Sequence, residues 1–167
     1  MDRRVFIGAA AGAVAAGAAD SAGAPRVLSD GGVSFSWSHR GGRLHATLRA
    51  PTRGWIAAGF NNRRTLEGTR FVIAAVAAAP IVVEEHIALV PDHRRVDRLG
   101  GTPALADVAG GFVGGVSRCD FSLPEAVVGA FPLDLAPGRP AYLMLAWSME
   151  PEFDHHSAWR KHYDVTL

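Results

Sequence analysis

Polar and apolar residues alternate along the first part of the chain. Residues 33–38 place Val, Phe and Trp between serines, and residues 43–49 place Leu, Ala and Leu between polar side chains. This period of two predicts β-strands with one buried face. Gly41-Gly42 lies between the two runs and favours a tight hairpin turn, because glycine adopts positive φ readily.

Further apolar segments continue the strand pattern towards the C-terminus. Most are bounded by Gly, Pro, Asn or Asp, and they cover residues 55–60, 71–76, 81–90, 114–121, 142–148 and 161–167. About eight or nine short strands at such spacing predict an all-β fold, an antiparallel sandwich or barrel. Residues 124–131 could instead form a helical turn, and we predict no element within residues 96–111.

The strand predicted over residues 141–147 is apolar on both faces. Such a strand lies at the centre of a sandwich or forms the wall of a ligand cavity. It leads into a polar loop, residues 148–157, which holds two adjacent histidines. Neutral imidazole binds metal ions and haem iron, so His155 and His156 are candidate ligands, with a solvated loop as the alternative. Neighbours in an extended backbone point to opposite sides, so we expect at most one of them to face a pocket.

A second polar cluster, Glu84-Glu85-His86, lies within a predicted strand. Alternation places Glu85 on the opposite face from Glu84 and His86, which argues against a pair of catalytic carboxylates. We expect this cluster to be solvated. The same is expected of three histidines near turns or on outward strand positions, His39, His45 and His93.

The composition excludes several classes of function. The formal net charge is +1, with no long basic run, so a nucleic-acid partner is not expected. Cys119 is the only cysteine, which rules out an internal disulfide and favours a buried, inert thiol. No paired nucleophile and base can be named, so a binding or electron-transfer module is expected rather than an enzyme.

The N-terminus is typical of a twin-arginine export signal. Arg3-Arg4 precedes Val-Phe-Ile and an Ala/Gly-rich run that is too short to cross a bilayer. Small-residue cleavage patterns end at Ala18 and Ala24, and Pro25 after the second favours the first. We expect residues 1–24 to form the signal.

What remains, residues 25–167, is expected to be one periplasmic domain with no membrane span. Five stretches of it, taken in order, resemble a DOMON domain; they are residues 54–60 (GWIAAGF), 66–73 (LEGTRFVI), 119–124 (CDFSLP), 142–147 (YLMLAW) and 154–157 (DHHS). The resemblance covers residues 33–167. It implies an immunoglobulin-like β-sandwich, secreted or periplasmic, that binds haem b or small ligands such as sugars and phenolic compounds.

In haem-binding members of that family, the iron lies between a methionine after the GW…GF motif and a histidine near the C-terminus. The resemblance assigns the histidine to His156, or to its neighbour His155. Leu66 stands where the methionine would be, and its side chain offers iron no donor.

Two functions therefore stay open. The first is binding of a small molecule, or assistance to a periplasmic redox partner protein. It would use a pocket at Leu66 walled by five further side chains, Trp55, Phe60, Phe71, Met144 and Trp147. The alternative is electron transfer through haem b, with His156 as the axial ligand. The missing methionine favours the first.

Overall fold

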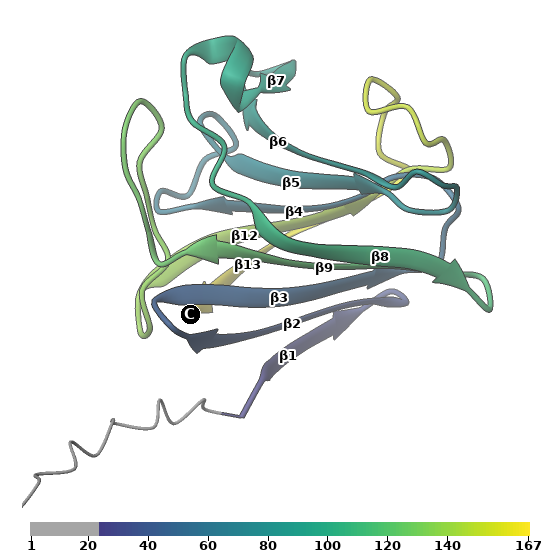
Figure 1. The fold of residues 1–167 in the computed structure, drawn as a ribbon, viewed down its shortest axis with the longest axis horizontal. Helices are drawn as coiled ribbons and strands as arrows, with labels where there is room; N and C mark the ends of the chain where they lie inside the picture. The colour runs from purple at the N-terminus through teal and green to yellow at the C-terminus, as the bar shows by residue number, and fades with distance from the viewer. Residues whose placement is uncertain (1–23) are drawn as a thin grey trace, which may run out of the picture.

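The structure, a computed structural model, describes residues 24–167. The first 23 residues, which hold nearly all of the predicted export signal, lie outside the described residues. Two antiparallel sheets pack face to face, as Figure 1 shows, and the predicted all-β sandwich is confirmed. Residues 24–167 contain no helix with the length and hydropathy that crossing a membrane requires.

The first sheet has five strands in the order β1-β2-β3-β9-β8. Their bounds, in the same order, are Arg26–Asp30, Val33–Arg40, Arg43–Ala50, Val116–Pro124 and Ala106–Val113. The second sheet has six strands in the order β13-β12-β4-β5-β6-β7. These span Trp159–Thr166, Pro140–Trp147, Ile56–Asn61, Arg70–Ala75, Val82–Ala88 and His93–Arg95.

The remaining elements are short. A two-stranded ribbon pairs β10 (Ala126–Val127) with β11 (Leu133–Asp134), and one turn of 3₁₀-helix, η1, spans Val96–Leu99. The helical turn expected over residues 124–131 is therefore wrong, because the start of this segment pairs as β10. Residues 96–111, where no element was expected, hold η1 and most of β8.

The main core lies between the two sheets. Alternate residues of β2 and β3 point inward as predicted; Phe35 and Leu44, for example, are fully buried. β4 is buried at every position, because one of its faces meets this core and the other meets a second apolar cluster on the outside of the sheet. The sheet is thus covered on both sides at its centre. Cys119 is buried as expected, and burial raises the pKa of its thiol to about 12.

A buried ion pair holds the connection between the sheets. Arg70 on β5 forms two hydrogen bonds of 3.2 Å to the Glu85 carboxylate on β6, and both side chains are almost fully enclosed. Glu85 also accepts the backbone N–H of Ala104, and Arg70 donates to the carbonyl of Thr102. The expectation that Glu85 is solvated is therefore wrong, because the following chain folds over it. Glu85 does lie on the opposite face of β6 from Glu84 and His86, as predicted.

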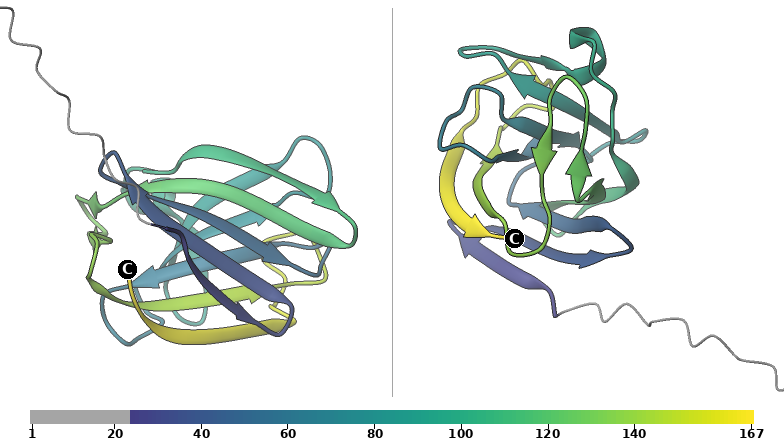
Figure 2. Two further views of the ribbon diagram at one scale, coloured as in Figure 1. Left: turned by 90° about the horizontal axis from the view of Figure 1, so that it is seen from below. Right: turned by 90° about the vertical axis from the view of Figure 1, so that its left-hand side faces the viewer.

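The two sheets are tied at one side where β1 lies beside β13, which the two views of Figure 2 show. Arg26 donates a hydrogen bond to the carbonyl of Thr166. Asp30 accepts hydrogen bonds from Lys161, at 2.6 Å, and from the hydroxyl of Tyr163, at 3.0 Å. These contacts close the sandwich along that side.

Candidate ligand pocket

An apolar floor lies on the outer face of the second sheet, away from the main core. The buried side chains that form it are Trp55, Ala57, Phe71, Ile73, Ala88 and Ala146, with Leu66, Met144 and Phe153 packed against them. A cavity of about 440 Å³ opens above this floor. That volume is within the range of small-molecule and cofactor pockets.

Small residues make room for the cavity. Ala57, Ala88 and Ala146 keep the floor low, and Gly59 on β4 lets the ring of Phe71 lie across it. Phe71 and Gly59 are partners in the β4–β5 register. A β-carbon at Gly59 would overlap that ring, so the floor depends on glycine at this position.

The rim of the cavity is polar and rich in histidine. Its side chains come from the start of β7 and the residue before it, from the loop after β12 and from β13; they are Asp92, His93, Asp154, His155, His156, Ser157, Arg160 and His162. The apolar floor and polar rim together suit an amphiphilic molecule, with its apolar part on the sheet and its polar groups at the opening.

Hydrogen bonds to the backbone hold the loop after β12, residues 148–158, over the floor. The indole Nε1 of Trp55 donates to the carbonyl of His155 at 3.2 Å, and Ser148 Oγ donates to the carbonyl of His156 at 3.1 Å. The backbone N–H of Trp55 donates to the carbonyl of Glu150. Gly54 is needed here because a β-carbon would overlap the backbone of residues 148–150.

The imidazoles of His155 and His156 are left available by this arrangement. Their carbonyls fix the loop, whereas their exposed rings form no hydrogen bond with any part of the chain that the structure describes. Both residues line the cavity, whereas the sequence predicted that at most one of them would face it. That expectation assumed extended backbone, but these residues follow a turn and a bend.

A row of hydrogen-bonded side chains runs beside the cavity. His86 Nε2 contacts Glu84 Oε2 at 2.9 Å, and His86 Nδ1 contacts His93 Nδ1 at 2.8 Å. His86 is buried and His93 partly buried, so the expectation that both are solvated is wrong. His93 reaches the cavity because β7 pairs with β6, which sets it opposite the floor residue Ala88. His39 and His45 are also only partly exposed.

Burial lowers the pKa of two of the rim histidines. It lowers the pKa of His93, with the charge of His86 adding to the effect. It also lowers the pKa of His162, which Arg160 reinforces, and the ring of His162 stacks on Tyr142 with 4.8 Å between centroids. Both imidazoles therefore favour the neutral form, which keeps a nitrogen lone pair.

Six of the eight side chains proposed from the sequence meet at this cavity; they are Trp55, Leu66, Phe71, Met144, His155 and His156. Phe60 and Trp147 do not. They pack on the main core, because Phe60 lies an odd number of residues from Ala57, and Trp147 an odd number from Met144. The same alternation, counted from Met144, would have identified Ala146 as a floor residue. Reasoning from sequence also missed His93, Arg160 and His162.

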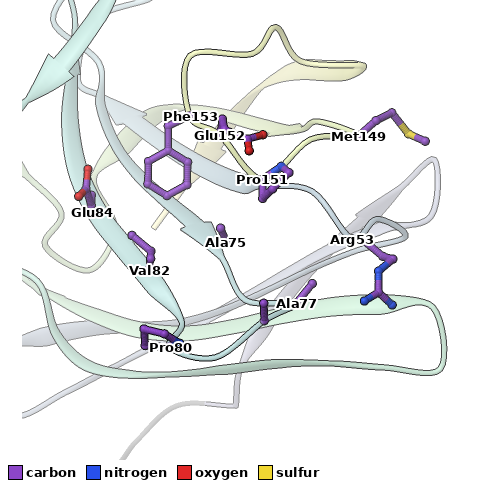
Figure 3. A pocket seen from close by; sticks show the side chains of 11 residues that line it. Arg53, Ala75, Ala77, Pro80, Val82, Glu84, Met149, Pro151, Glu152 and Phe153 are labelled. Atoms are coloured by element: carbon purple, nitrogen blue, oxygen red, sulfur yellow. The ribbon is translucent and has the colours of Figure 1, made fainter.

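A second cavity, of about 520 Å³, lies on the other side of the loop after β12 (Figure 3). It is lined by Arg53, Ala75, Ala77, Ala78, Pro80, Val82, Glu84, Met149, Pro151, Glu152 and Phe153. Phe153 belongs to both regions, since it lines this cavity and also packs on the floor of the first. Within residues 24–167, no three His, Cys, Asp or Glu side chains are grouped so as to hold a metal ion.

The overall structure is similar to two solved cytochrome domains. The cytochrome b domain of pyranose dehydrogenase from Coprinopsis cinerea matches with a TM-score of 0.59 and 13% identity, over 86% of this chain and 88% of that one. The cytochrome domain of Myriococcum thermophilum cellobiose dehydrogenase matches with a TM-score of 0.59 and 9% identity, over 86% and 81%. No family model and no curated protein matches the sequence. At this identity the likeness concerns the fold alone, and at that level it confirms the predicted resemblance to the DOMON family.

Proposed function

We propose that this chain is an exported electron-transfer domain that binds haem b in the 440 Å³ cavity on the outer face of the second sheet. The observation that carries the proposal is the position of His155 and His156, whose unpartnered imidazoles line an apolar cavity in a fold like that of cytochrome b domains. Electron transfer through haem b is the second of the two functions that the sequence left open. The structural likeness supports it over the first.

The residues present fit the group. His156 or His155 would supply an imidazole nitrogen to hold the haem iron. The floor of Trp55, Phe71 and small residues offers an apolar surface to the macrocycle. Arg160 at the rim would pair with its carboxylates. When bound, haem b would supply a one-electron redox centre.

The domain itself would set the environment of that centre. The apolar floor excludes water from one side, and the neutral His93 and His162 keep the net charge of the rim low. Low polarity disfavours the oxidised, more positive state of a buried redox group. Export through the twin-arginine route would place the domain in the periplasm beside a redox partner protein.

Leu66 supports a second candidate function. Its side chain packs at the floor of the cavity and cannot bind iron, so the same cavity would hold a small molecule without haem. Sugars and phenolic compounds are the classes that the resemblance implies. Such a function needs the floor but not the imidazoles of His155 and His156.

Absorbance distinguishes the two functions. Mature protein mixed with hemin should develop a Soret band, and His156→Ala combined with His155→Ala should abolish or shift it. His45→Ala is the matched control, because His45 lies on the outer face of the first sheet, away from the cavity. Wild-type protein that gives no Soret band would contradict haem binding and leave the small-molecule function.

A further inference from the structure

Three side chains connect the candidate pocket to the second cavity. Glu84 lines the second cavity, where Figure 3 shows it beside Val82 and Phe153. His86 lies between the two cavities and lines neither of them. His93 lines the candidate pocket. Hydrogen bonds of 2.9 Å and 2.8 Å join the three in sequence.

The atoms involved restrict where protons can sit. Both ends of the contact between the rings are Nδ1 atoms, so one ring must donate and the other accept. Glu84 as a carboxylate accepts from His86 Nε2, which leaves His86 Nδ1 to accept from His93 in the neutral state. A proton that His93 gains at Nε2 can therefore move along the row, because His93 can pass its Nδ1 proton to His86 Nδ1 and His86 can pass its Nε2 proton to Glu84.

The surrounding charges favour protonation at the His93 end. Arg95 on β7 contacts the other oxygen of Glu84 at 3.1 Å and is itself paired with Asp97. Asp92 and Asp154 lie near His93 and favour its protonated form, as does the carbonyl of Phe153. The remaining charged or titratable groups at the rim are Arg160, His155, His156 and His162. Glu84 is about one quarter exposed, whereas His86 is almost enclosed.

We propose that the Glu84–His86–His93 row couples proton uptake to reduction of the group in the candidate pocket. This inference rests on the proposed function, because it requires a redox centre in the cavity. An outside one-electron donor would lower the charge in the pocket by one, and the row would take up one proton from solvent at His93, on the rim of the pocket, to offset it. No covalent bond forms or breaks except the N–H and O–H bonds that carry the proton.

The electrostatics support this coupling. Lowering the positive charge of the pocket raises the proton affinity of a nearby base, and the effect is larger in a poorly solvated region than in water. Burial lowers the pKa of His93, so this ring is neutral near pH 7 and is able to gain a proton. Phe153 packs edge-on against His86, with 5.9 Å between ring centroids, which keeps the row apart from solvent in its middle.

The test is the pH dependence of the midpoint potential of the full chain loaded with hemin, measured from about pH 5 to about pH 8. Wild-type protein should show a slope that approaches about 59 mV per pH unit, the value for one proton per electron. His86→Gln should flatten the slope. Glu84→Gln should move the sloping region to lower pH, because loss of the carboxylate lowers the proton affinity of the pair. His45→Gln should behave as wild type.

A second readout uses the protein without hemin. Nuclear magnetic resonance of the imidazole rings should show a lowered pKa for His93, mainly through burial, and Glu84→Gln should lower this pKa further. Neither Glu84 nor His86 lines the candidate pocket, so both variants should retain the Soret band. If His86→Gln does not fold, the Glu84→Gln result decides.

The outcomes separate the two proposals. A Soret band with the same slope in wild type and in Glu84→Gln would overturn the coupling and leave haem binding intact. An unchanged pKa of His93 in Glu84→Gln would overturn it as well. Wild-type protein without a Soret band would overturn haem binding, and the coupling with it.

Discussion

The ring of Phe71 lies across Gly59, its register partner on the neighbouring strand, and covers the place where a β-carbon would be. An aromatic side chain therefore lies flat on the sheet instead of standing on it. The floor of the candidate pocket owes its shape to this pair, because any side chain at residue 59 would raise the ring into the cavity.

Gly59→Ala should destabilise the domain by about 1–3 kcal/mol, the usual effect of an added methyl group in a packed region. It should also weaken ligand binding, because Phe71 must move. Urea unfolding measures the first effect and hemin titration the second. Gly111→Ala is the matched control, since no atom would contact a β-carbon there. Equal stability of the two variants would contradict the packing described for Phe71.

Glu85→Ala should be among the most destabilising single changes in the chain. It leaves the guanidinium of Arg70 buried without its carboxylate, which costs about 3–5 kcal/mol. Asp164→Ala is the control, because its pair with Arg64 is exposed on both sides and should contribute less than about 1 kcal/mol. Urea midpoints for both variants check the difference. A small effect of Glu85→Ala would mean that water enters the site.

Leu66→Met should add a thioether at a position of the cavity floor where wild-type protein has a leucine. In hemin-loaded protein, a second axial ligand should change the spectrum towards that of low-spin, six-coordinate iron. Met144→Leu removes the other thioether at this floor and serves as the comparison, since its spectrum should match wild type. A spectrum of Leu66→Met identical to wild type would show that residue 66 does not reach the iron.

The free energy of unfolding should fall as the pH drops below about 6.5. His93 and His162 have lowered pKa values in the folded domain, mainly through burial, so the unfolded chain binds protons more readily than the folded one. Stability is thus greatest above the unfolded pKa and is lost as pH falls towards the folded values. His93→Gln should reduce this dependence. Urea midpoints at several pH values measure it, and an unchanged slope in the variant would contradict the burial of His93.

The sequence was sufficient to predict the sandwich and six of the residues that line the pocket. Alternation located the main strands, and the two-sided apolar pattern of residues 141–147 pointed to a strand with a cavity on one side. The prediction failed where it ignored the same alternation. Phe60 and Trp147 were placed in the pocket because they are aromatic and lie in the right motifs, although their positions in the strands turn them towards the core.

The histidine row could not be predicted, because it depends on pairing between strands. Residues 93–95 are too short and too polar to be recognised as a strand, yet their register with β6 brings His93 against His86. Glu85 was likewise misjudged, because its partner Arg70 and the covering residues 102–104 come from other parts of the chain. Contacts of this kind are set by topology and not by local pattern.

The ion pair between β1 and β13 has a consequence for association with other proteins. These outer strands hold each other through Asp30 and Lys161, β7 has only three residues, two of them arginines, and β8 is interrupted by a bulge. None of these margins offers a long, regular row of free backbone groups, so aggregation by strand addition is disfavoured. A partner protein would therefore contact side chains in the loops of this domain and would form no backbone hydrogen bonds with the edges of its sheets.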